Sequence, residues 1–386
     1  MGQKNASIVI IGAGIVGSSI AYHLAIRGCS DVVILEKASS EVTGSTARSA
    51  AGVRHQFASA INIRLSIYSI EQLKHFRETV GGYAELKQIG YLLLVSNPQT
   101  WEQYKRNVAL QNSLGVRSRA ITPEQILDLV PSIRIDDLLG ATYCPDDGYC
   151  DPYGIATGYL SAARRLGVRL MRSTPVLRIR KTHDRVVSVE VPGARLDCET
   201  VVNAAGPWAG RVGELAGLHI PVRPFRRCVY MTEPFSLIPR HIPMTIDVGS
   251  DFYMRKENER VLFGLSNADE PSSENTAVDW DWLNTVINVG IRRMPLLEKA
   301  ALAAKNCWAG LYEITPDHNP VLGIHPYLPN YVDASGFSGH GVMHAPATGK
   351  LIAEEILDGR ATTIDIDELR IDRFANRELR PEANVF

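Results

Sequence analysis

The sequence predicts a fold of the α/β + α+β class, in which a domain with a helix-covered parallel sheet is interleaved with a second, largely antiparallel domain. Three observations support this prediction. With 386 residues, the chain is too long for one simple hydrophobic core. Strand–helix units lie at both ends of the chain. Short β-type runs separated by turns fill its middle.

The chain begins with a predicted strand, a glycine turn, a helix and a second strand. Residues 8–11 form a continuous apolar run, as expected for a strand of a parallel sheet that is covered on both faces. Apolar positions such as Ile15 and Leu24 suit a helix that ends near Gly28. Residues 32–35 form the second strand.

Further along, the pattern changes from helical to β-type. Residues 62–80 repeat apolar side chains at helical spacing. Five short runs then predict strands of the antiparallel type: YLLLVS, VVSVEV, RCVYMTE, DFYMRK and RVLFGL. Near the end, NYVDASG predicts a strand and APATGKLIAEEILDG a helix capped by Gly359. Because strand–helix units enclose the β-rich middle, we expect the two domains to alternate along the sequence.

The segment Gly12-Ala-Gly14-Ile-Val-Gly17 is a GxGxxG motif between a predicted strand and a predicted helix, which is the context of a Rossmann-like dinucleotide site. Gly12 allows the tight turn, Gly14 lets the backbone approach a pyrophosphate, and Gly17 lets the helix pack closely on the strand. The helix N-terminus offers free N–H groups to the phosphates. Glu36, at the end of the second strand, suits a ribose hydroxyl and disfavours a 2′-phosphate, so NADP is not expected.

Three features favour FAD over NAD as the dinucleotide. The chain has one GxGxxG motif, so it lacks a second complete site for NAD(P)H. Residues 44–55 are small and polar, as an extended FAD needs along its length. Residues 200–210 form an apolar strand that ends in small residues able to lie against a cofactor. We therefore expect FAD.

Composition argues against several other classes of protein. The net charge of −1, without a long basic run, argues against nucleic acid as a partner. No apolar run approaches the roughly 18 residues of a membrane helix, and the start MGQKNAS lacks a signal pattern, so a cytoplasmic protein is expected. The six cysteines include no CxxC pair. Cys144 and Cys150 would need two further ligands to hold a metal ion, and no metal is expected.

The segment GFSGHGVMHAPATGK, residues 336–350, has three possible interpretations. A phosphate loop would need a glycine where His344 stands. A metal site would need His340 and His344 on one helix, whereas Pro346 favours a helix that begins only about there. The third interpretation is the favoured one. Small residues let the backbone approach a flavin, and the helix N-terminus stabilises negative charge on the reduced ring.

Taken together, these motifs resemble the D-amino-acid-oxidase-like flavoproteins, in particular the branch of sarcosine oxidase, the proline dehydrogenase β-subunit, glycine oxidase and D-arginine dehydrogenase. The matching segments keep the family's order over nearly the whole chain: GAGIVG with Glu36, GSTARSAAGVR, ATYCPDDGYCDPYGIATGYLSAARRLGV, VVNAAGPWAG, WAGLYEITPDHNPVLG and GFSGHGVMHAPATGK. The resemblance implies a Rossmann-like FAD-binding domain of residues 1–85, 145–215 and 315–386. It implies a substrate domain, with a mixed, largely antiparallel sheet, of residues 86–144 and 216–314.

The resemblance also implies which residues contact FAD. They belong to the glycine turn, the acidic strand end, the small polar segment and later loops: Gly12, Gly14, Ile15, Val16, Gly17, Glu36, Lys37, Ser45, Thr46, Arg48, Ser49, Gly52, Val176, Ala205, Gly206, Gly310, Gly339, His340, Gly341, Val342 and Met343. Some members of the family bond the flavin to a cysteine or a histidine, at positions where this chain has Gly310 and Ser49. FAD is therefore expected to be held without a covalent bond.

By the same resemblance, five residues are candidate catalytic residues: Arg54, Tyr253, His340, Tyr312 and Met343. Arg54 stands where sarcosine oxidases bind the substrate carboxylate, and a surface or phosphate-facing arginine is the alternative. Tyr253 matches a tyrosine of the substrate cavity, and a half-buried strand tyrosine is the alternative. Tyr312 and Met343 are expected to line the pocket, and an apolar core role is the alternative for Met343. His340 is expected to position or polarise groups at the site and not to bind a metal ion.

Other positions bear on the type of reaction. By the resemblance, two lysines of the sarcosine oxidases are replaced by Leu262 and Met343. The first replacement leaves open whether O2 or another acceptor is used, and the second argues against sarcosine as the substrate. Arg226 and Arg227 are within possible reach of a substrate, but paired arginines are usually solvated or ion-paired.

The implied activity is oxidation of the C–N bond of an amino acid or secondary amine, by hydride transfer to flavin N5, giving an imine that hydrolyses. One alternative is the FAD-carrying β-type subunit of a hetero-oligomeric dehydrogenase, which passes electrons to a partner subunit. Another alternative is a non-catalytic flavin-binding assembly factor. The ending IDELRIDRFANRE is similar to the corresponding segment of an assembly factor of this family. The sequence leaves open the substrate and its chirality, the choice of O2 or another external electron acceptor, and the oligomeric state.

Overall fold

A computed structural model describes residues 4–376 and 379–385 of the chain. Within these residues, the strands form two large sheets and one small one. The first three residues of MGQKNAS and the last two of IDELRIDRFANRE lie outside the described residues. No helix in the described part of the chain is both long enough and apolar enough to cross a membrane.

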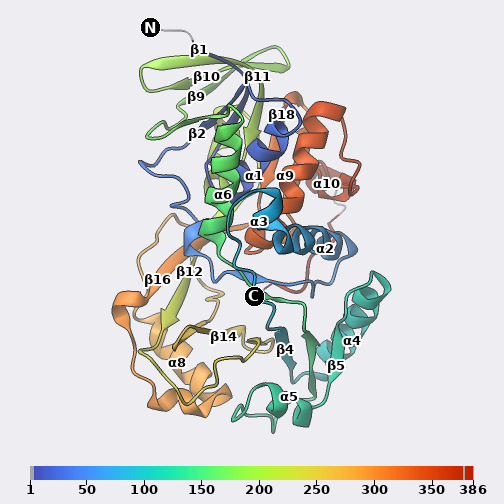
Figure 1. The fold of residues 1–386 in the computed structure, drawn as a ribbon, viewed down its shortest axis with the longest axis vertical. Helices are drawn as coiled ribbons and strands as arrows, with labels where there is room; N and C mark the ends of the chain where they lie inside the picture. Colours follow the sequence, from blue (N-terminus) through green and yellow to red (C-terminus); the bar gives the residue numbers. More distant parts are fainter. Residues whose placement is uncertain (1–3, 377–378, 386) are drawn as a thin grey trace.

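The first large sheet has a parallel centre. Its main strands run in the order β17 (Val321–His325), β18 (Leu328–Ser335), β11 (Ala194–Asn203), β1 (Lys4–Ile11), β2 (Val32–Leu35) and β8 (Arg169–Met171). β1 pairs in parallel with β2 and β11, β2 with β8, and β11 with β18, whereas β17 is antiparallel to β18. β2 has the predicted bounds and is buried along its whole length. The sheet lies in the upper half of Figure 1.

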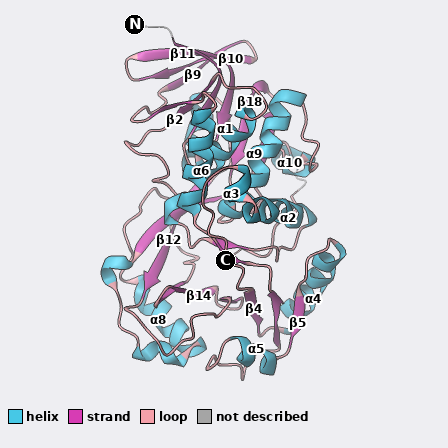
Figure 2. Ribbon diagram, viewed as in Figure 1, coloured by secondary structure: helices cyan, strands magenta, loops and turns pink. Residues whose placement is uncertain are grey.

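Four long helices pack beside this sheet, as Figure 2 shows: α1 (Ile15–Ala25), α2 (Ala60–Lys74), α6 (Pro152–Arg165) and α9 (Gly341–Asp358). α1 contacts α6 and α9, and all of its residues are buried. The contact of α1 with α9 is close, because a Cβ on Gly349 would lie 2.1 Å from Ser19 Oγ. The largest hydrophobic core therefore lies between this helix layer and the sheet.

The second large sheet lies in the lower half of Figure 1. Its strands run in the order β16 (Trp308–Ile314), β12 (Arg223–Met231), β15 (Arg260–Gly264), β14 (Phe252–Glu257), β13 (Met244–Asp247), β4 (Tyr91–Val95), β6 (Gly140–Cys144) and β5 (Arg119–Ile121). Neighbouring strands are antiparallel except β13 and β4, which are parallel. The prediction of a mixed, largely antiparallel sheet is confirmed. Three helices pack on it: α4 (Pro98–Ser113), α5 (Pro123–Leu129) and α8 (Trp282–Arg293).

The remaining elements are short: α3 (Phe76–Thr79), α7 (Ala209–Leu215), α10 (Arg373–Asn376), β3 (Gly52–Val53), β7 (Gly148–Tyr149), β9 (Arg178–Thr182) and β10 (Arg185–Val191). β3 and β7 form the small antiparallel sheet. The predicted strand VVSVEV lies in β10, which pairs antiparallel with β9 and β11. This strand therefore extends the first sheet, not the second.

Two helix predictions differ from the structure. The helix predicted over residues 62–80 is divided at His75, where α2 ends and α3 begins. The prediction that the last long helix begins about Pro346 is wrong, because α9 begins at Gly341 and Pro346 lies inside it. A proline inside a helix removes one N–H donor. Residues 342–349 are all buried, so packing stabilises the helix despite this loss.

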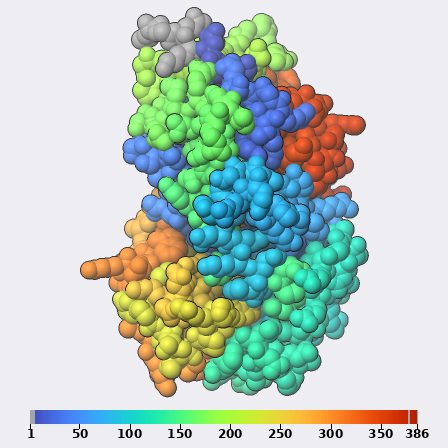
Figure 3. Space-filling model, in the orientation of Figure 1, coloured from blue at the N-terminus to red at the C-terminus, as the bar shows by residue number. Residues whose placement is uncertain are grey.

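The chain passes back and forth between the two large sheets. Residues 4–35, 169–203 and 321–335 supply the main strands of the first sheet, and residues 91–144 and 223–314 supply the second. Figure 3 shows α2 and α3, in light blue, over the junction of the two halves on this face. The alternation agrees with interleaved domains, whose boundaries stay a prediction.

Candidate active site

A cavity of about 670 Å³ is lined by residues from both sheets and from the loops between them. Its volume is within the range of about 300–1,000 Å³ that is typical of ligand and cofactor sites. Every residue predicted to contact FAD lines this cavity except Gly17, and so do the five candidate catalytic residues. Segments from Gly12 to Met343 therefore meet at one place. Their contact with a ligand stays a prediction.

Steric contacts give the three glycines of the turn different roles. Gly12 has a φ of +111°, and a Cβ on it would lie 2.4 Å from Ala204 O. A Cβ on Gly17 would lie 2.0 Å from Gly12 O, so Gly17 allows α1 to pack against the turn and does not face the cavity. Gly14 precedes α1 and lines the cavity, where it leaves the backbone open to a ligand.

Glu36 and Thr46 hold the main chain of this turn. Glu36 accepts hydrogen bonds from Ala13 N–H at 3.0 Å and from Ala38 N–H at 2.9 Å, one on each oxygen. A carboxylate has about four lone-pair sites, so each oxygen can accept a further hydroxyl. Thr46 Oγ1 accepts from Ile15 N–H at 3.1 Å. One of the free N–H groups of the first turn of α1 is thus used by the protein itself.

The segment after β2 is fixed to β16. Ser45 Oγ donates to Leu311 O at 2.7 Å, and Arg48 Nη1 donates to Ala309 O at 3.0 Å. A Cβ on Gly310 would lie 3.0 Å from both the Cβ and the carbonyl oxygen of Arg48. This close approach accounts for a glycine at position 310, because a larger side chain would displace Arg48.

His340 and His344 form a buried hydrogen-bonded pair. Their Nδ1 atoms lie 3.1 Å apart. His340 Nε2 lies 3.0 Å from His318 O, and His344 Nε2 lies 3.0 Å from Ser66 Oγ. Because a carbonyl only accepts, His340 carries its proton on Nε2 and accepts at Nδ1 from His344. Ser66 then donates to His344 Nε2. Both nitrogens of each ring are used within the protein, which disfavours the metal interpretation.

Burial keeps these two rings neutral. It lowers the pKa of His340 to about 3, and the nearby Arg54 adds to the decrease. Burial also lowers the pKa of His344, with His340 and Arg54 as smaller causes. His340 therefore acts as a fixed neutral hydrogen-bonding group at physiological pH, not as a cation.

α9 begins at the cavity. His340 is its N-cap residue, and the cavity is lined by Gly339, Gly341, Val342 and Met343. The partial positive charge of a helix N-terminus therefore faces the cavity, as the sequence predicted. The start of the helix five residues earlier than expected brings this charge next to the glycines of the loop.

Arg54 and two tyrosines lie in another part of the cavity wall. A Cβ on Gly339 would lie 2.4 Å from the Tyr312 ring, so Tyr312 covers the loop that precedes α9. Arg54 is buried, with its guanidinium 4.0 Å from the centroid of the Phe57 ring. Burial raises the pKa of Tyr312 and of Tyr253. Both phenols are therefore protonated near neutral pH and available as donors.

The backbone fixes the Arg54 guanidinium. Nη1 donates to Gln56 O at 2.5 Å, and Nη2 donates to Asn384 O. The alternative of a surface arginine is therefore wrong, because the side chain is both buried and bonded. Leu262, which the family resemblance aligned with a lysine, is fully buried and is not part of the cavity wall.

A cluster of His55, Cys144 and Asp147 lies beside Arg54 and was not predicted from the sequence. One ligand atom of each residue lies within 4.8 Å of the others. Asp147 Oδ1 lies 2.8 Å from His55 N and 2.7 Å from His55 Nδ1, and its Oδ2 accepts from Gln56 Nε2 at 3.2 Å. Burial raises the pKa of the Cys144 thiol. These hydrogen bonds hold the cluster together and fix the segment that carries Arg54.

Cys144 and Cys150, for which the sequence indicated only a conditional and disfavoured metal role, are both free and buried but lie in different surroundings. Cys144 lies with His55 and Asp147, whereas the Cys150 thiol lies 3.8 Å from Ala51 O. The residues between them form the β7 turn, so nearness in sequence did not bring the two thiols to one ligand site.

Glu313, which follows Tyr312 on β16, also lines the cavity. Its carboxylate accepts a hydrogen bond from Gly336 N–H at 3.1 Å. Burial raises the pKa of Glu313 to about 7, and hydrogen bonds from Gly336 and Phe337 oppose the increase. A carboxyl group that titrates near neutral pH inside a cavity is a candidate functional group. In the sequence, Glu313 could have been noticed only as a single acidic residue within the apolar run WAGLYEI.

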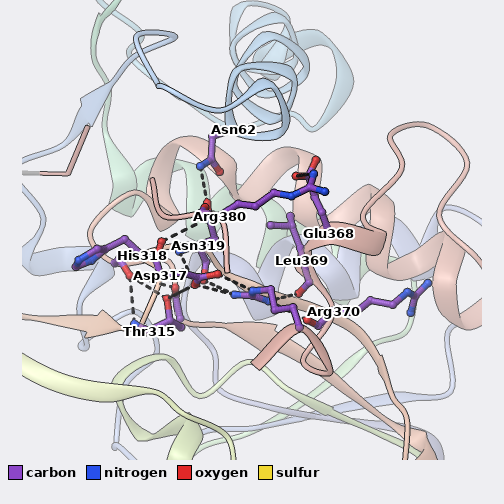
Figure 4. Close-up of polar contacts among 12 residues, drawn as sticks. Asn62, Thr315, Asp317, His318, Asn319, Glu368, Leu369, Arg370 and Arg380 are labelled. Atoms are coloured by element: carbon purple, nitrogen blue, oxygen red, sulfur yellow. Dashed lines mark hydrogen bonds and ion pairs between the residues drawn. The ribbon is translucent and has the colours of Figure 1, made fainter. Parts of the chain in front are cut away.

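Residues 315–319 form a polar loop that ties the cavity wall to distant segments (Figure 4). Asp317 forms a buried ion pair with Arg373, with 2.7 Å between Asp317 Oδ2 and Arg373 Nε. Asn62 Nδ2 donates to Asn319 Oδ1 at 2.8 Å, which links the loop to α2. The loop carries His318, whose carbonyl binds His340. This network therefore positions the histidine pair.

Residues 379–385 contribute to the site in a way that the sequence did not suggest. Glu382 accepts from Ser59 Oγ at 2.7 Å, at the start of α2. The carbonyl of Asn384 accepts from Arg54, and Val385 lines the cavity. This segment therefore forms part of the cavity wall and holds one of its cations.

Residues 7–355 match the model of a protein family described as “FAD dependent oxidoreductase”. Mitochondrial dimethylglycine dehydrogenase of Rattus norvegicus is 32% identical over 96% of this chain and 45% of that protein. The chain thus spans about half the length of the dimethylglycine dehydrogenases that it matches. FAD-dependent oxidoreductase domain-containing protein 1 of Xenopus laevis is 31% identical over 99% of this chain and 85% of that protein.

Solved structures have the same fold. The crystal structure of L-proline dehydrogenase from P. horikoshii superposes with a TM-score of 0.90, at 32% identity, over 98% of this chain and 100% of that one. That of glycine oxidase from Geobacillus kaustophilus superposes with a TM-score of 0.83 over 96% of this chain and 99% of that one, and its identity of 23% supports likeness of fold alone.

Proposed function

The chain belongs to the family of FAD-dependent oxidoreductases, and we propose that it oxidises the C–N bond of an amino acid or a secondary amine that carries a carboxylate. The names of similar proteins support this substrate class, because they are dehydrogenases of dimethylglycine, sarcosine and L-proline. The imine product hydrolyses in water.

One observation carries the proposal: a single cavity is lined both by a dinucleotide turn and by a buried cation with two phenols. Gly12, Gly14 and Glu36 belong to the first group, and Arg54 and Tyr312 to the second. A redox enzyme for amino acids needs a cofactor site and an anion-binding site within one space.

The residues of the cavity fit FAD. The open backbone at Gly14 and the N-terminus of α1 suit a pyrophosphate, and the two Glu36 oxygens suit ribose hydroxyls. Gly339 and Gly341 line the cavity at the start of α9, where their backbone is available to a flat ring. When bound, FAD supplies the acceptor of two electrons from the substrate.

We further propose that FAD is held without a covalent bond. Gly310 has no side chain to react, and Ser49 is not a thiol or an imidazole. The serine hydroxyl accepts a hydrogen bond from Ala51 N–H at 2.9 Å, so it has a structural role in its own loop.

The protein contributes orientation and electrostatics. In the proposal, Arg54 binds the substrate carboxylate, because a fixed guanidinium recognises a carboxylate with little loss of entropy on binding. The protonated phenols of Tyr253 and Tyr312 donate hydrogen bonds to the bound substrate. The N-terminus of α9 stabilises negative charge that develops beside it. The neutral His340 keeps that helix terminus in place.

The proposal is tested by steady-state assays with an artificial electron acceptor and a panel of amino acids and N-methyl amines. We expect turnover with one class of carboxylate-bearing amine, together with its carbonyl product after hydrolysis. Matched amines that lack the carboxylate are the control. If amines are oxidised equally with and without a carboxylate, the proposed role of Arg54 is contradicted, but the proposed oxidation of the C–N bond is not.

The same purification distinguishes the two alternatives. A second polypeptide that co-purifies and is required for electron transfer would identify a subunit of a hetero-oligomeric dehydrogenase. A flavin-containing protein that reduces no acceptor with any amine would favour the flavin-binding assembly factor. Activity in air, compared with activity with the artificial acceptor, separates an oxidase from a dehydrogenase.

A further inference from the structure

Two adjacent arginines on β12 have different surroundings. Side chains alternate along a strand, so Arg226 and Arg227 point to opposite faces of the sheet. Arg226 is ion-paired with Glu270 at 2.9 Å and with Asp279 at 2.7 Å. Arg227 instead lines the cavity. Of the two expected states, solvated or ion-paired, Arg226 has the second, whereas Arg227 is half-buried and lines the cavity.

The hydrogen-bond donors of the Arg227 guanidinium are only partly used by the described residues. Nη1 donates to Arg226 O at 2.9 Å, but Nε is buried and has no hydrogen-bond partner among the described residues. Within residues 4–376 and 379–385, Arg227 forms no ion pair. Burial raises the pKa of Asp251, and the positive charge of Arg227 opposes the increase. A buried donor without a partner is costly. The half-buried Arg227 side chain also lines the cavity, so its positive charge is available to an anionic ligand there.

Arg227, Arg54 and Tyr312 line the same cavity. The Arg227 guanidinium is 5.3 Å from the centroid of the Tyr312 ring. Burial raises the pKa of Tyr312, and both Arg227 and Arg54 oppose the increase. The phenol therefore experiences the positive charge of both arginines. The pyrophosphate has its own site at Gly14 and the start of α1, so Arg227 is not needed there.

We propose that Arg227 binds a second carboxylate of the substrate, and that the preferred substrate is an amino dicarboxylate. Arg54 holds one carboxylate and Arg227 the other, each through the two-pronged contact that guanidinium makes with carboxylate. The inference rests on the proposed oxidation of a carboxylate-bearing amine and narrows it. An amino acid with one carboxylate would leave one guanidinium unpaired in the closed site, at a cost in affinity.

The test compares ligands that differ in one carboxylate. Diglycolate and methoxyacetate are non-oxidisable analogues with two and one carboxylates, and their dissociation constants for the FAD-bound protein are measured by calorimetry. The wild-type protein is expected to bind diglycolate about ten- to a hundredfold more tightly than methoxyacetate, because diglycolate makes one more charged hydrogen-bonded contact. N-(Carboxymethyl)glycine and sarcosine form the oxidisable pair for the rate of flavin bleaching.

Variants assign the preference to one side chain. Arg227→Gln is expected to remove most of the preference for two carboxylates and to leave methoxyacetate binding unchanged. Arg227→Lys keeps the charge without the paired contact, so it should give an intermediate value. Arg223→Gln is the matched control, because Arg223 is exposed on the same strand and does not line the cavity.

Three outcomes would overturn the inference. The first is equal affinity of the wild-type protein for the two analogues, and this measurement needs no variant to fold. The second is a preference that survives in Arg227→Gln. The third is an equal loss for both analogues in that variant, which would make Arg227 a general support of the site. If both analogues bind as expected but no amine bleaches the flavin, the oxidation proposal fails and the dicarboxylate site stands.

Discussion

Asp333 is fully buried at the end of β18, where Asn203 Nδ2 lies 3.4 Å from its Oδ1. Burial raises the pKa of Asp333 from 3.8 to about 8. The folded protein therefore keeps a proton that the unfolded chain loses. The contribution of Asp333 to the free energy of unfolding should fall by about 1.4 kcal/mol per pH unit as pH rises from the unfolded pKa to the folded one.

Asp333→Asn should remove this decrease, because an amide of the same shape does not ionise. Urea unfolding at several pH values measures the effect. We expect the variant to gain stability relative to the wild-type protein as pH rises from about 4 to 8. A difference between the two proteins that does not change with pH would contradict the assignment.

Arg54 gives a second prediction at this scale. Arg54→Gln should raise KM for a carboxylate substrate by about ten- to a hundredfold, with a smaller change in kcat, because the lost contact is present before the reaction. Arg54→Lys should recover part of the loss. If kcat falls and KM does not change, Arg54 acts on the reacting atoms and not on the carboxylate.

Individual residues were predictable where local sterics decide their role. Gly12 and Gly17 follow from the spacing of the motif, since a Cβ on either would collide with backbone. The histidine pair was only partly predictable. Its tautomers depend on Ser66 and on the carbonyl of His318, which reach His340 and His344 only in the folded chain.

At the scale of elements, the N-terminus of α1 depends on a side chain from outside the helix. Thr46 Oγ1 accepts from Ile15 N–H, although the N-cap residue Gly14 has no side chain. Thr46→Val should therefore lower the free energy of unfolding by about 1 kcal/mol, as loss of an N-cap does. Thr46→Ser keeps the hydroxyl and is the control. Urea unfolding at saturating FAD measures both, and equal losses in the two variants would contradict the capping role.

Element types followed from the sequence, but some positions and partners did not. The apolar run of β2 has one compatible structure, a strand buried on both faces. The partner of β10 was not encoded locally, because an amphipathic run suits either sheet. The start of α9 was misplaced since local preference at Pro346 was overruled by burial of the surrounding residues, such as Ala345 and Ala347.

At the scale of the whole molecule, the cavity exists because the chain alternates between two sheets. The glycine turn lies in the first 20 residues, whereas Tyr312 and Met343 come from the last 80. The sequence predicted that these segments meet, through the family resemblance. It did not predict the contribution of Asn384 and Val385, because neither residue belongs to a motif.

The binding of FAD gives a prediction for the intact protein. Precipitation with acid should release all of the yellow colour into the supernatant, because Gly310 and Ser49 offer no covalent link. Absorbance of the supernatant and of the redissolved pellet measures the two fractions. Colour that stays with the washed pellet would show a covalent bond and contradict this part of the proposal.

The central claim is that one cavity brings a bound flavin and a carboxylate-bearing amine together for oxidation of a C–N bond. Anaerobic mixing of the purified yellow protein with the amine panel tests it most directly, because no electron acceptor or partner subunit is needed. The flavin absorbance should bleach with one class of amine, to an extent that matches the FAD content, and return when air or an artificial acceptor is added. Failure of every amine to bleach a fully FAD-loaded protein would contradict the claim.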